Sequence, residues 1–121
     1  MRFDESRPIY LQIAEHFCDK IMNEEWPPGE RVPSVREIAA LIEVNPNTAM
    51  RAFHLLLESN ILVQQRGVGY FTTSTAKSKV VEMRKEQFLN EELPELFSKM
   101  KQLSFTPEDL QQLYQKWEEQ N

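Results

Sequence analysis

The sequence predicts a mainly α-helical fold with a small β-hairpin, and three observations lead to that prediction. Apolar residues recur at helical spacing near both ends of the chain. Between residues 34 and 58 two helix-start signals follow closely, which predicts two short helices joined by a tight turn. An alternating run and a glycine-containing turn come next and predict a hairpin. Together these elements predict a winged helix-turn-helix, followed by a short two-helix tail.

Composition and length favour a helix-rich globular protein. The 121 residues include 40% hydrophobic residues and only three glycines, which argues against disorder. No apolar run approaches the roughly 18 residues that span a membrane, and no signal-peptide pattern opens the chain. Cys18 is the one cysteine, and we expect it to be buried in the first helix of a cytoplasmic protein with no membrane partner.

The first predicted helix runs from about Arg7 to Glu25, with Ser6 as its cap. Its apolar stripe repeats every four residues, at Ile9, Ile13, Phe17 and Ile21. The turn at residues 26–29 contains two prolines, which cannot donate in a helix, and we expect Trp26 to anchor this turn by packing. Residues 30–32 follow as a short extended segment that can pair with the hairpin as a third strand.

The helix-turn-helix begins at Ser34, which forms a capping box with Glu37. The second helix begins with Asn45 as N-cap and Pro46 at the first helical position. Helical periodicity places one apolar side of this second helix toward the core. The residues of that side are Ala49, Ala52, Phe53 and Leu56.

The opposite side of the second helix is polar and carries Asn47, Arg51, His54 and Glu58. Simple solvation would explain such a face. However, Asn47, Thr48 and Arg51 cluster in the first turns, where a recognition helix meets base edges. Asparagine and arginine are also the side chains that read adenine and guanine with two hydrogen bonds. The pattern therefore favours a DNA-reading face, with Glu58 lying clear of the duplex.

The hairpin carries an arginine at its tip. Residues 61–65 and 70–73 are the predicted strands, and Arg66 stands in the turn between them. Gly67 and Gly69 permit positive φ angles and a close backbone approach. An arginine held there can enter a narrow minor groove or contact phosphate.

The stretches just described resemble the GntR family of bacterial repressors. Residues 31–39 (RVPSVREIA) carry the signature hydrophobe-Pro-Ser-x-Arg-x-hydrophobe-Ala, and residues 45–53 (NPNTAMRAF) look like the variant of the YtrA-type subfamily. Residues 8–13 (PIYLQI) resemble the first helix of that subfamily, and residues 66–71 resemble its wing. The resemblance covers roughly residues 6–73 and implies sequence-specific binding of double-stranded DNA.

The resemblance also bears on single residues. In GntR-like proteins the arginine that matches Arg36 contacts DNA; the alternative role of Arg36 is a surface salt bridge with Glu37 or Glu43. Many members carry arginine where Pro46 and Met50 stand, so we expect an operator that differs from the consensus of the larger subfamilies. The expected DNA contacts are Arg36, Asn45, Asn47, Thr48, Arg51, His54, Arg66, Gly67 and Gly69.

The charge distribution is compatible with this function. A net charge of −5 argues mildly against nucleic-acid binding. Between residues 31 and 73, however, four arginines stand against three acids, and residues 59–81 contain no acid at all. We therefore expect a weak overall field and specificity that depends on a few placed contacts.

We place the domain boundary after residue 74, which gives a winged helix-turn-helix domain at 1–74 and a helical tail at 75–121. The apolar helical pattern of the tail continues across Pro94, which predicts one kinked helix, and Thr106 with Pro107 starts a last helix. These apolar stripes are too rich to stay exposed, so we expect a homodimer, or alternatively a tail that folds back on its own domain. The predicted dimer interface consists of Leu93, Leu96, Phe97, Met100, Leu110, Leu113, Tyr114 and Trp117.

We expect a homodimeric transcriptional regulator, a repressor that occupies a palindromic operator, with no catalytic residues, cofactor or metal. The resemblance implies a short dimerisation tail and control of a nearby operon, often one that encodes an ABC-type transporter. Two other functions stay open. A winged-helix module that binds a protein partner is supported only by the acidic charge. A sensor would bind an unknown small-molecule effector in a pocket between tail and wing.

Overall fold

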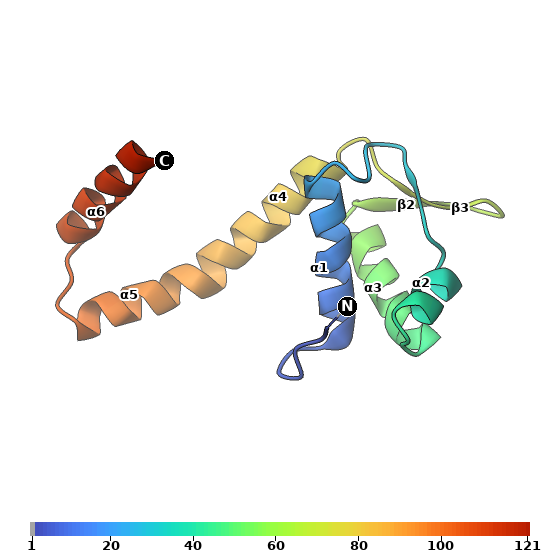
Figure 1. Cartoon of the computed structure of the whole chain (residues 1–121), viewed down its shortest axis with the longest axis horizontal. Coiled ribbons are helices and arrows are strands. Elements are labelled where there is room, and N and C mark those ends of the chain that lie inside the picture. Colours follow the sequence, from blue (N-terminus) through green and yellow to red (C-terminus); the bar gives the residue numbers. More distant parts are fainter. Residues whose placement is uncertain (1) are drawn as a thin grey trace. The chain divides into compact units, whose positions relative to one another are not determined.

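The computed structural model describes residues 2–121, which form two compact units, one ending at Glu82 and one running from Met83 to Asn121. The first unit contains helices α1 (Ile9–Met22), α2 (Val35–Leu41) and α3 (Pro46–Glu58) and a three-stranded sheet (Figure 1). Helix α4 (Ala76–Gln87) begins in the first unit and ends in the second. Ala76 and Val80 of α4 are buried, so the start of this helix belongs to the first unit. The assignment of residues 1–74 to a DNA-binding domain and of residues 75–121 to a dimerisation tail remains a prediction.

The predicted bounds and cap of the first helix are wrong. Helix α1 begins at Ile9, with Pro8 rather than Ser6 in the cap position. The hydroxyl of Ser6 instead donates to Asp4 Oδ1 at 2.7 Å, and its amide donates to the same oxygen at 2.9 Å. These two hydrogen bonds lower the pKa of the Asp4 carboxyl, the side-chain bond most. Helix α1 ends at Met22. Glu24 has a φ of 62°, and because a right-handed helix requires negative φ angles, the helix cannot extend to Glu25 as predicted.

The side chain of Gln12 secures the segment before α1. Its Nε2 donates to the carbonyl oxygens of Asp4 at 2.7 Å and Arg7 at 3.0 Å, and its Oε1 accepts from the Asp4 amide at 2.7 Å. Gln12 is buried, so these bonds are shielded from water. Gln12 therefore ties the segment before α1 to the helix, although it is not part of the predicted apolar stripe.

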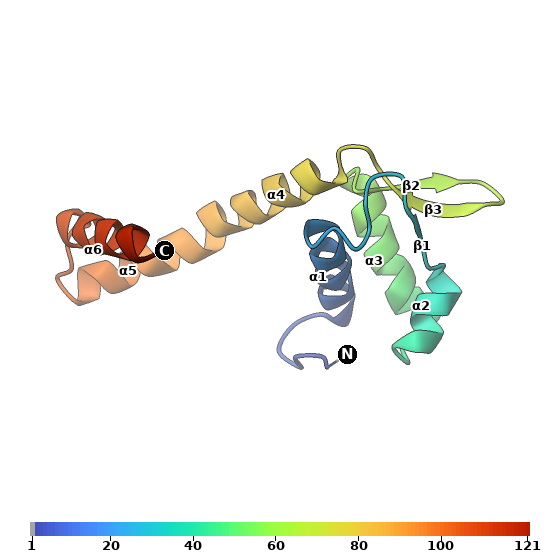
Figure 2. The same cartoon turned by 45° about the horizontal axis from the view of Figure 1, so that its top comes forward.

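The helix-turn-helix matches its sequence signals. Ser34 and Glu37 form the predicted capping box at α2, and the Asn45 side chain caps α3 with Pro46 in its first turn. The buried residues of α3 are the four predicted ones, Ala49, Ala52, Phe53 and Leu56. Helix α3 packs against α1 and against α2, and Figure 2 shows it between them.

The sheet has the strand order β1-β3-β2, with β1 at Arg31–Val32, β2 at Leu62–Gln65 and β3 at Gly69–Thr72. Both pairings are antiparallel, so the predicted third strand is confirmed. In β3 the buried residues alternate: Tyr70 and Thr72 face the core. The β2–β3 hairpin is the wing of the fold and extends away from the helices (Figure 1).

An aromatic chain runs through the core of the first unit and fixes α3 in place. Phe17 of α1 lies edge-on to Trp26, with ring centroids 4.8 Å apart, and 5.3 Å from the ring of Phe53 in α3. Phe53 in turn packs on Tyr70 of β3 at 4.8 Å. Phe17 and Phe53 are fully buried, and Trp26 packs on Phe17 as expected of an anchor for this turn.

In the second unit, α4 continues directly into the π-helical turn η1 (Phe88–Glu92) and then into α5 (Leu93–Gln102). In this π-helical turn the amide of Leu93 donates to the carbonyl of Phe88, five residues earlier. The next residue, Pro94, has no amide hydrogen to donate. The helix is therefore continuous across Pro94, as predicted. Thr106 and Asp109 form a capping box at α6 (Pro107–Gln120). No helix within residues 2–121 is long and apolar enough to cross a membrane.

Candidate nucleic-acid interface

The exposed face of α3 forms a shallow hollow on the first unit. Asn47, Arg51 and His54 are exposed there, as the sequence predicted, while Thr48 is half-buried. The hollow has a volume of about 410 Å³ and is lined by Tyr10, Asn47, Met50, Arg51, His54, Leu55 and Glu58. It contains a carboxamide, a guanidinium and an imidazole, which can donate to bases and phosphates. Glu58 also lines this hollow, although we expected it to lie clear of a bound duplex.

Asn45 is partly committed to the helix itself. Its Oδ1 accepts a hydrogen bond of 2.8 Å from the Asn47 amide, which satisfies one of the open donors at the start of α3. The NH₂ group of this side chain takes no part in the cap. Asn45 can therefore donate to DNA without giving up its capping bond.

Arg51 has a partner that the sequence analysis did not assign. Its Cζ atom lies 4.1 Å from the centroid of the Tyr10 ring, which belongs to the first turn of α1. Tyr10 follows Ile9, where the predicted apolar stripe begins, and it is half-buried in the structure. The position of Tyr10 on its own helix gives no signal for this contact, which depends on the packing of α1 against α3.

The wing supplies a second basic group. Arg66 is exposed at its tip, and Gly67 and Gly69 have φ angles of 74° and 148°, so both glycines occupy positive-φ backbone as predicted. The Arg31 side chain from β1 lies against Gly69, which pairs with Gln65 next to the turn of the same hairpin. Arg31 is exposed and was not among the predicted contacts, although it opens the signature at residues 31–39.

None of these basic side chains is neutralised within the described chain. Ion pairs join Arg7 to Glu15, Lys20 to Glu25, Lys77 to Glu24 and Lys79 to Glu82. Among residues 2–121, no carboxylate lies within ion-pair distance of the four arginines between residues 31 and 73. Neither of the two alternative partners predicted for Arg36 pairs with it: Glu37 accepts from the Ser34 amide, and Glu43 lies beyond ion-pair distance. The positive charge of this stretch is thus available to a phosphate backbone.

No group of three or more His, Cys, Asp or Glu side chains within residues 2–121 is arranged to hold a metal ion. The one cysteine, Cys18, is fully buried in α1, as predicted.

Known proteins resemble this chain over most of its length. The sequence model of the bacterial regulatory proteins of the gntR family matches residues 9–72, from the start of α1 to the end of β3. The chain is 36% identical over 109 residues to the HTH-type transcriptional regulator YhcF of Bacillus subtilis (strain 168), which covers 90% of this chain and 88% of the relative. It is 36% identical over 91 residues to the HTH-type transcriptional repressor YtrA of the same strain, covering 75% and 69%.

A solved structure agrees with the sequence relatives. A GntR-family regulator from Bacteroides thetaiotaomicron superposes with a TM-score of 0.81 at 37% identity, covering 93% of this chain and 99% of that one. The gntR family model matches the segment that forms the helix-turn-helix and the wing. YhcF and the Bacteroides regulator match over most of their own length. The chain belongs to the gntR family of bacterial regulatory proteins and is a DNA-binding transcriptional regulator of the helix-turn-helix type.

Proposed function

We propose that the chain is a homodimeric repressor that reads a palindromic operator with α3 in the major groove and the wing beside it. The observation that carries this proposal is the face of α3 described above. One side of the helix is buried in the core, and the other presents Asn47, Arg51 and His54 to solvent. Glu58 lines the same face, but among the described residues no carboxylate forms an ion pair with Arg51. A helix held rigidly from behind and polar in front suits insertion into a groove.

Each basic group has its own proposed task. Arg51 and Asn47 read base edges, because they stand in the first two turns of α3. Arg36 at the start of α2 and Arg66 on the wing contact phosphate or the minor groove. To these predicted contacts we add Arg31, because its side chain lies beside the wing glycine Gly69.

The tail supports dimerisation. None of the residues in η1, α5 and α6 is buried within the chain. Four of the eight predicted interface residues are more than half exposed: Phe97 at 54%, Leu113 at 53%, Tyr114 at 57% and Trp117 at 58%. Large apolar side chains in such numbers usually mark a surface that another protein chain covers. A second copy of this chain is the simplest partner, since symmetry would cover both tails at once.

A palindromic operator follows from such a dimer. A two-fold axis would present two copies of α3 to two half-sites about one DNA turn apart. The relative YtrA is named a repressor, and the resemblance to its subfamily favours repression of a nearby transporter operon. Control of the chain's own gene would fit the same arrangement.

The test is fluorescence anisotropy of the purified protein on DNA from upstream of its own gene, at about 50 and 200 mM salt, with shuffled DNA as competitor. Binding that survives the competitor and weakens with salt supports the proposal. Selection from a random duplex pool extends the test to operators elsewhere. A folded dimer that enriches no sequence from that pool would favour the protein-interaction module.

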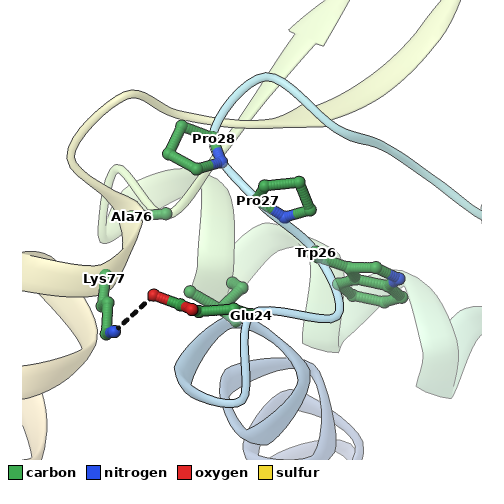
Figure 3. A pocket seen from close by; sticks show the side chains of 7 residues that line it. Glu24, Trp26, Pro27, Pro28, Ala76 and Lys77 are labelled. Carbon is green, nitrogen blue, oxygen red and sulfur yellow. Dashed lines mark hydrogen bonds and ion pairs between the residues drawn. The ribbon is translucent and has the colours of Figure 1, made fainter.

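We also propose a small-molecule effector for the regulator, because the first unit contains a second pocket. It has a volume of about 430 Å³ and is lined by the turn after α1 and by the start of α4. Figure 3 shows Lys77 and Glu24 joined by an ion pair of 3.0 Å beside Pro27, Pro28 and Ala76. The sensor predicted from sequence placed its pocket between tail and wing, whereas no wing residue lines this one.

The effector proposal is tested separately from DNA binding. A thermal-shift screen against a panel of metabolites should raise the melting temperature with one class of compound. The variant Lys77→Trp, which narrows the pocket from an exposed lining position, should abolish that shift and leave DNA binding intact. A screen without any stabilising compound would remove the support for an effector at this pocket.

A further inference from the structure

The contact between Tyr10 and Arg51 brings α1 into the neighbourhood of the DNA-reading face. Tyr10 stands in the first turn of α1, and α1 packs along α3. The ring and the guanidinium both line the hollow over the exposed face of α3, together with Asn47 and His54. The tyrosine therefore touches the one arginine of α3, at 4.1 Å between Cζ and the ring centroid.

An aromatic ring restrains an arginine differently from a carboxylate. A carboxylate takes two of the N–H donors and cancels the charge, so an arginine paired in that way has less to offer to DNA. A ring contacts the face of the guanidinium, whereas the five N–H donors point outward in its plane. Among residues 2–121 Arg51 has the ring as a neighbour and no carboxylate within ion-pair distance. Its direction is restrained while its charge and donors are kept.

We propose that Tyr10 is a positioning residue for Arg51, which holds the guanidinium in one orientation over the groove-facing side of α3 before DNA arrives. The inference rests on the proposed function, since it requires Arg51 to contact bases. A long flexible side chain loses rotamer freedom when it binds a base edge. Because the Tyr10 ring already restricts the rotamers of Arg51 in the free protein, less freedom is lost on binding. The effect therefore falls on binding to the correct sequence, with little effect on sequence-independent attraction to phosphate.

The experiment uses four variants of the full chain: Tyr10→Leu, Tyr10→Phe, Arg51→Ala and the combination of Tyr10→Leu with Arg51→Ala. The probe is a duplex enriched from a random pool by the wild-type protein, and a shuffled duplex serves as the reference. Anisotropy at one salt concentration gives the ratio of the two affinities. Relaxation of the arginine Nε–Hε groups, measured by NMR without DNA, reports the mobility of Arg51 independently of binding.

Tyr10→Leu should reduce the affinity ratio about two- to fivefold, which is the size of a cation–π contact at an exposed site. It should also raise the mobility of the Arg51 Nε–Hε group. Tyr10→Phe keeps the ring and should match the wild type in both measurements. In the Arg51→Ala background the leucine should have no further effect, because the two residues act as one unit.

Two outcomes would overturn the inference. One is wild-type mobility of Arg51 and a wild-type affinity ratio in Tyr10→Leu. The other is an equal loss with and without Arg51, which would mean that Tyr10 acts through the fold. A third result concerns the proposed function: if Arg51→Ala leaves the affinity ratio unchanged, Arg51 does not read bases, whatever Tyr10 does to its mobility.

Discussion

The side chain of Arg31 lies directly against the backbone of Gly69, so close that a β-carbon at position 69 would stand 3.0 Å from Arg31 Nε. The two residues belong to neighbouring strands, because β1 pairs with β3. The backbone of the wing at Gly69 therefore leaves room for the side chain of Arg31, which comes from the neighbouring strand. Glycine at this position serves both the backbone, whose φ is 148°, and the space that Arg31 occupies.

Replacing Gly69 with alanine should cost more stability than the same change at Gly67. At Gly67, with φ of 74°, nothing lies within 4 Å of an added β-carbon, so only the backbone cost of about 1–2 kcal/mol applies. Gly69→Ala should cost about 1–3 kcal/mol, because a φ of 148° lies outside the left-handed region that alanine can reach and because the exposed Arg31 side chain must also move aside. Urea unfolding of both variants compares them. An equal or larger loss for Gly67→Ala would contradict the fitted contact.

Thr72 ties the turn after α1 to the sheet. Its Oγ1 donates to the Pro27 carbonyl at 2.7 Å and accepts from the Glu30 amide at 2.9 Å, and the residue is buried. Thr72→Val keeps the shape and removes both of these hydrogen bonds, while the Glu30 amide still donates to the Pro27 carbonyl at 3.1 Å, so the loss should be about 1–2 kcal/mol. Thr73→Val is the matched control, because its single bond to the Asn60 carbonyl lies at the surface. Chemical denaturation that ranks Thr73→Val as the more harmful change would refute this account.

Arg51 and Arg66 should respond differently to truncation. Arg51→Ala should lower specific affinity by about 1–3 kcal/mol and relax the base preference. Arg66→Ala should weaken binding to all sequences alike and reduce the slope of log affinity against log salt by about 1. Titrations of both variants on selected and shuffled DNA at several salt concentrations separate the two roles. A near-equal loss on both DNAs for Arg51→Ala would assign it to phosphate.

Local signals in the sequence predicted the helix-turn-helix and wing well. Caps at Ser34, Asn45 and Thr106 are short-range hydrogen bonds between near neighbours, so the residues that form them stand together in the sequence. The buried side of α3 follows from helical periodicity in the same way. The cap predicted at Ser6 failed because α1 begins only at Ile9, and the amide and hydroxyl of Ser6 both donate to Asp4 Oδ1 in the turn before it.

The residues that the sequence analysis missed depend on contacts between distant segments. Tyr10 and Arg51 are 41 positions apart, and Arg31 and Gly69 are 38 apart. Both pairs meet only because α1 packs on α3 and β1 pairs with β3. Periodicity assigns each residue to a face of its own element, but it does not determine which face of another element lies opposite.

The tail gives the sharpest test of the proposed dimer. Trp117→Ala removes the most exposed of the predicted interface side chains and preserves helix propensity, so α6 should persist. If the tail forms the interface, the dimer should weaken by about 2 kcal/mol or more, roughly thirtyfold in dissociation constant. Sedimentation equilibrium measures this change. Gln112→Ala, on the polar side of the same helix, should leave the dimer intact.

The same variant links assembly to DNA binding. A dimer binds a full palindrome through two tethered contacts, so the loss of pairing should lower affinity for the full site much more than for a half-site. Trp117→Ala should therefore bind a half-site duplex like the wild type and a palindrome far more weakly. Equal loss on both duplexes would mean that Trp117 supports the winged-helix unit itself. A wild-type chain that sediments as a monomer would show that something other than a second copy covers the tail.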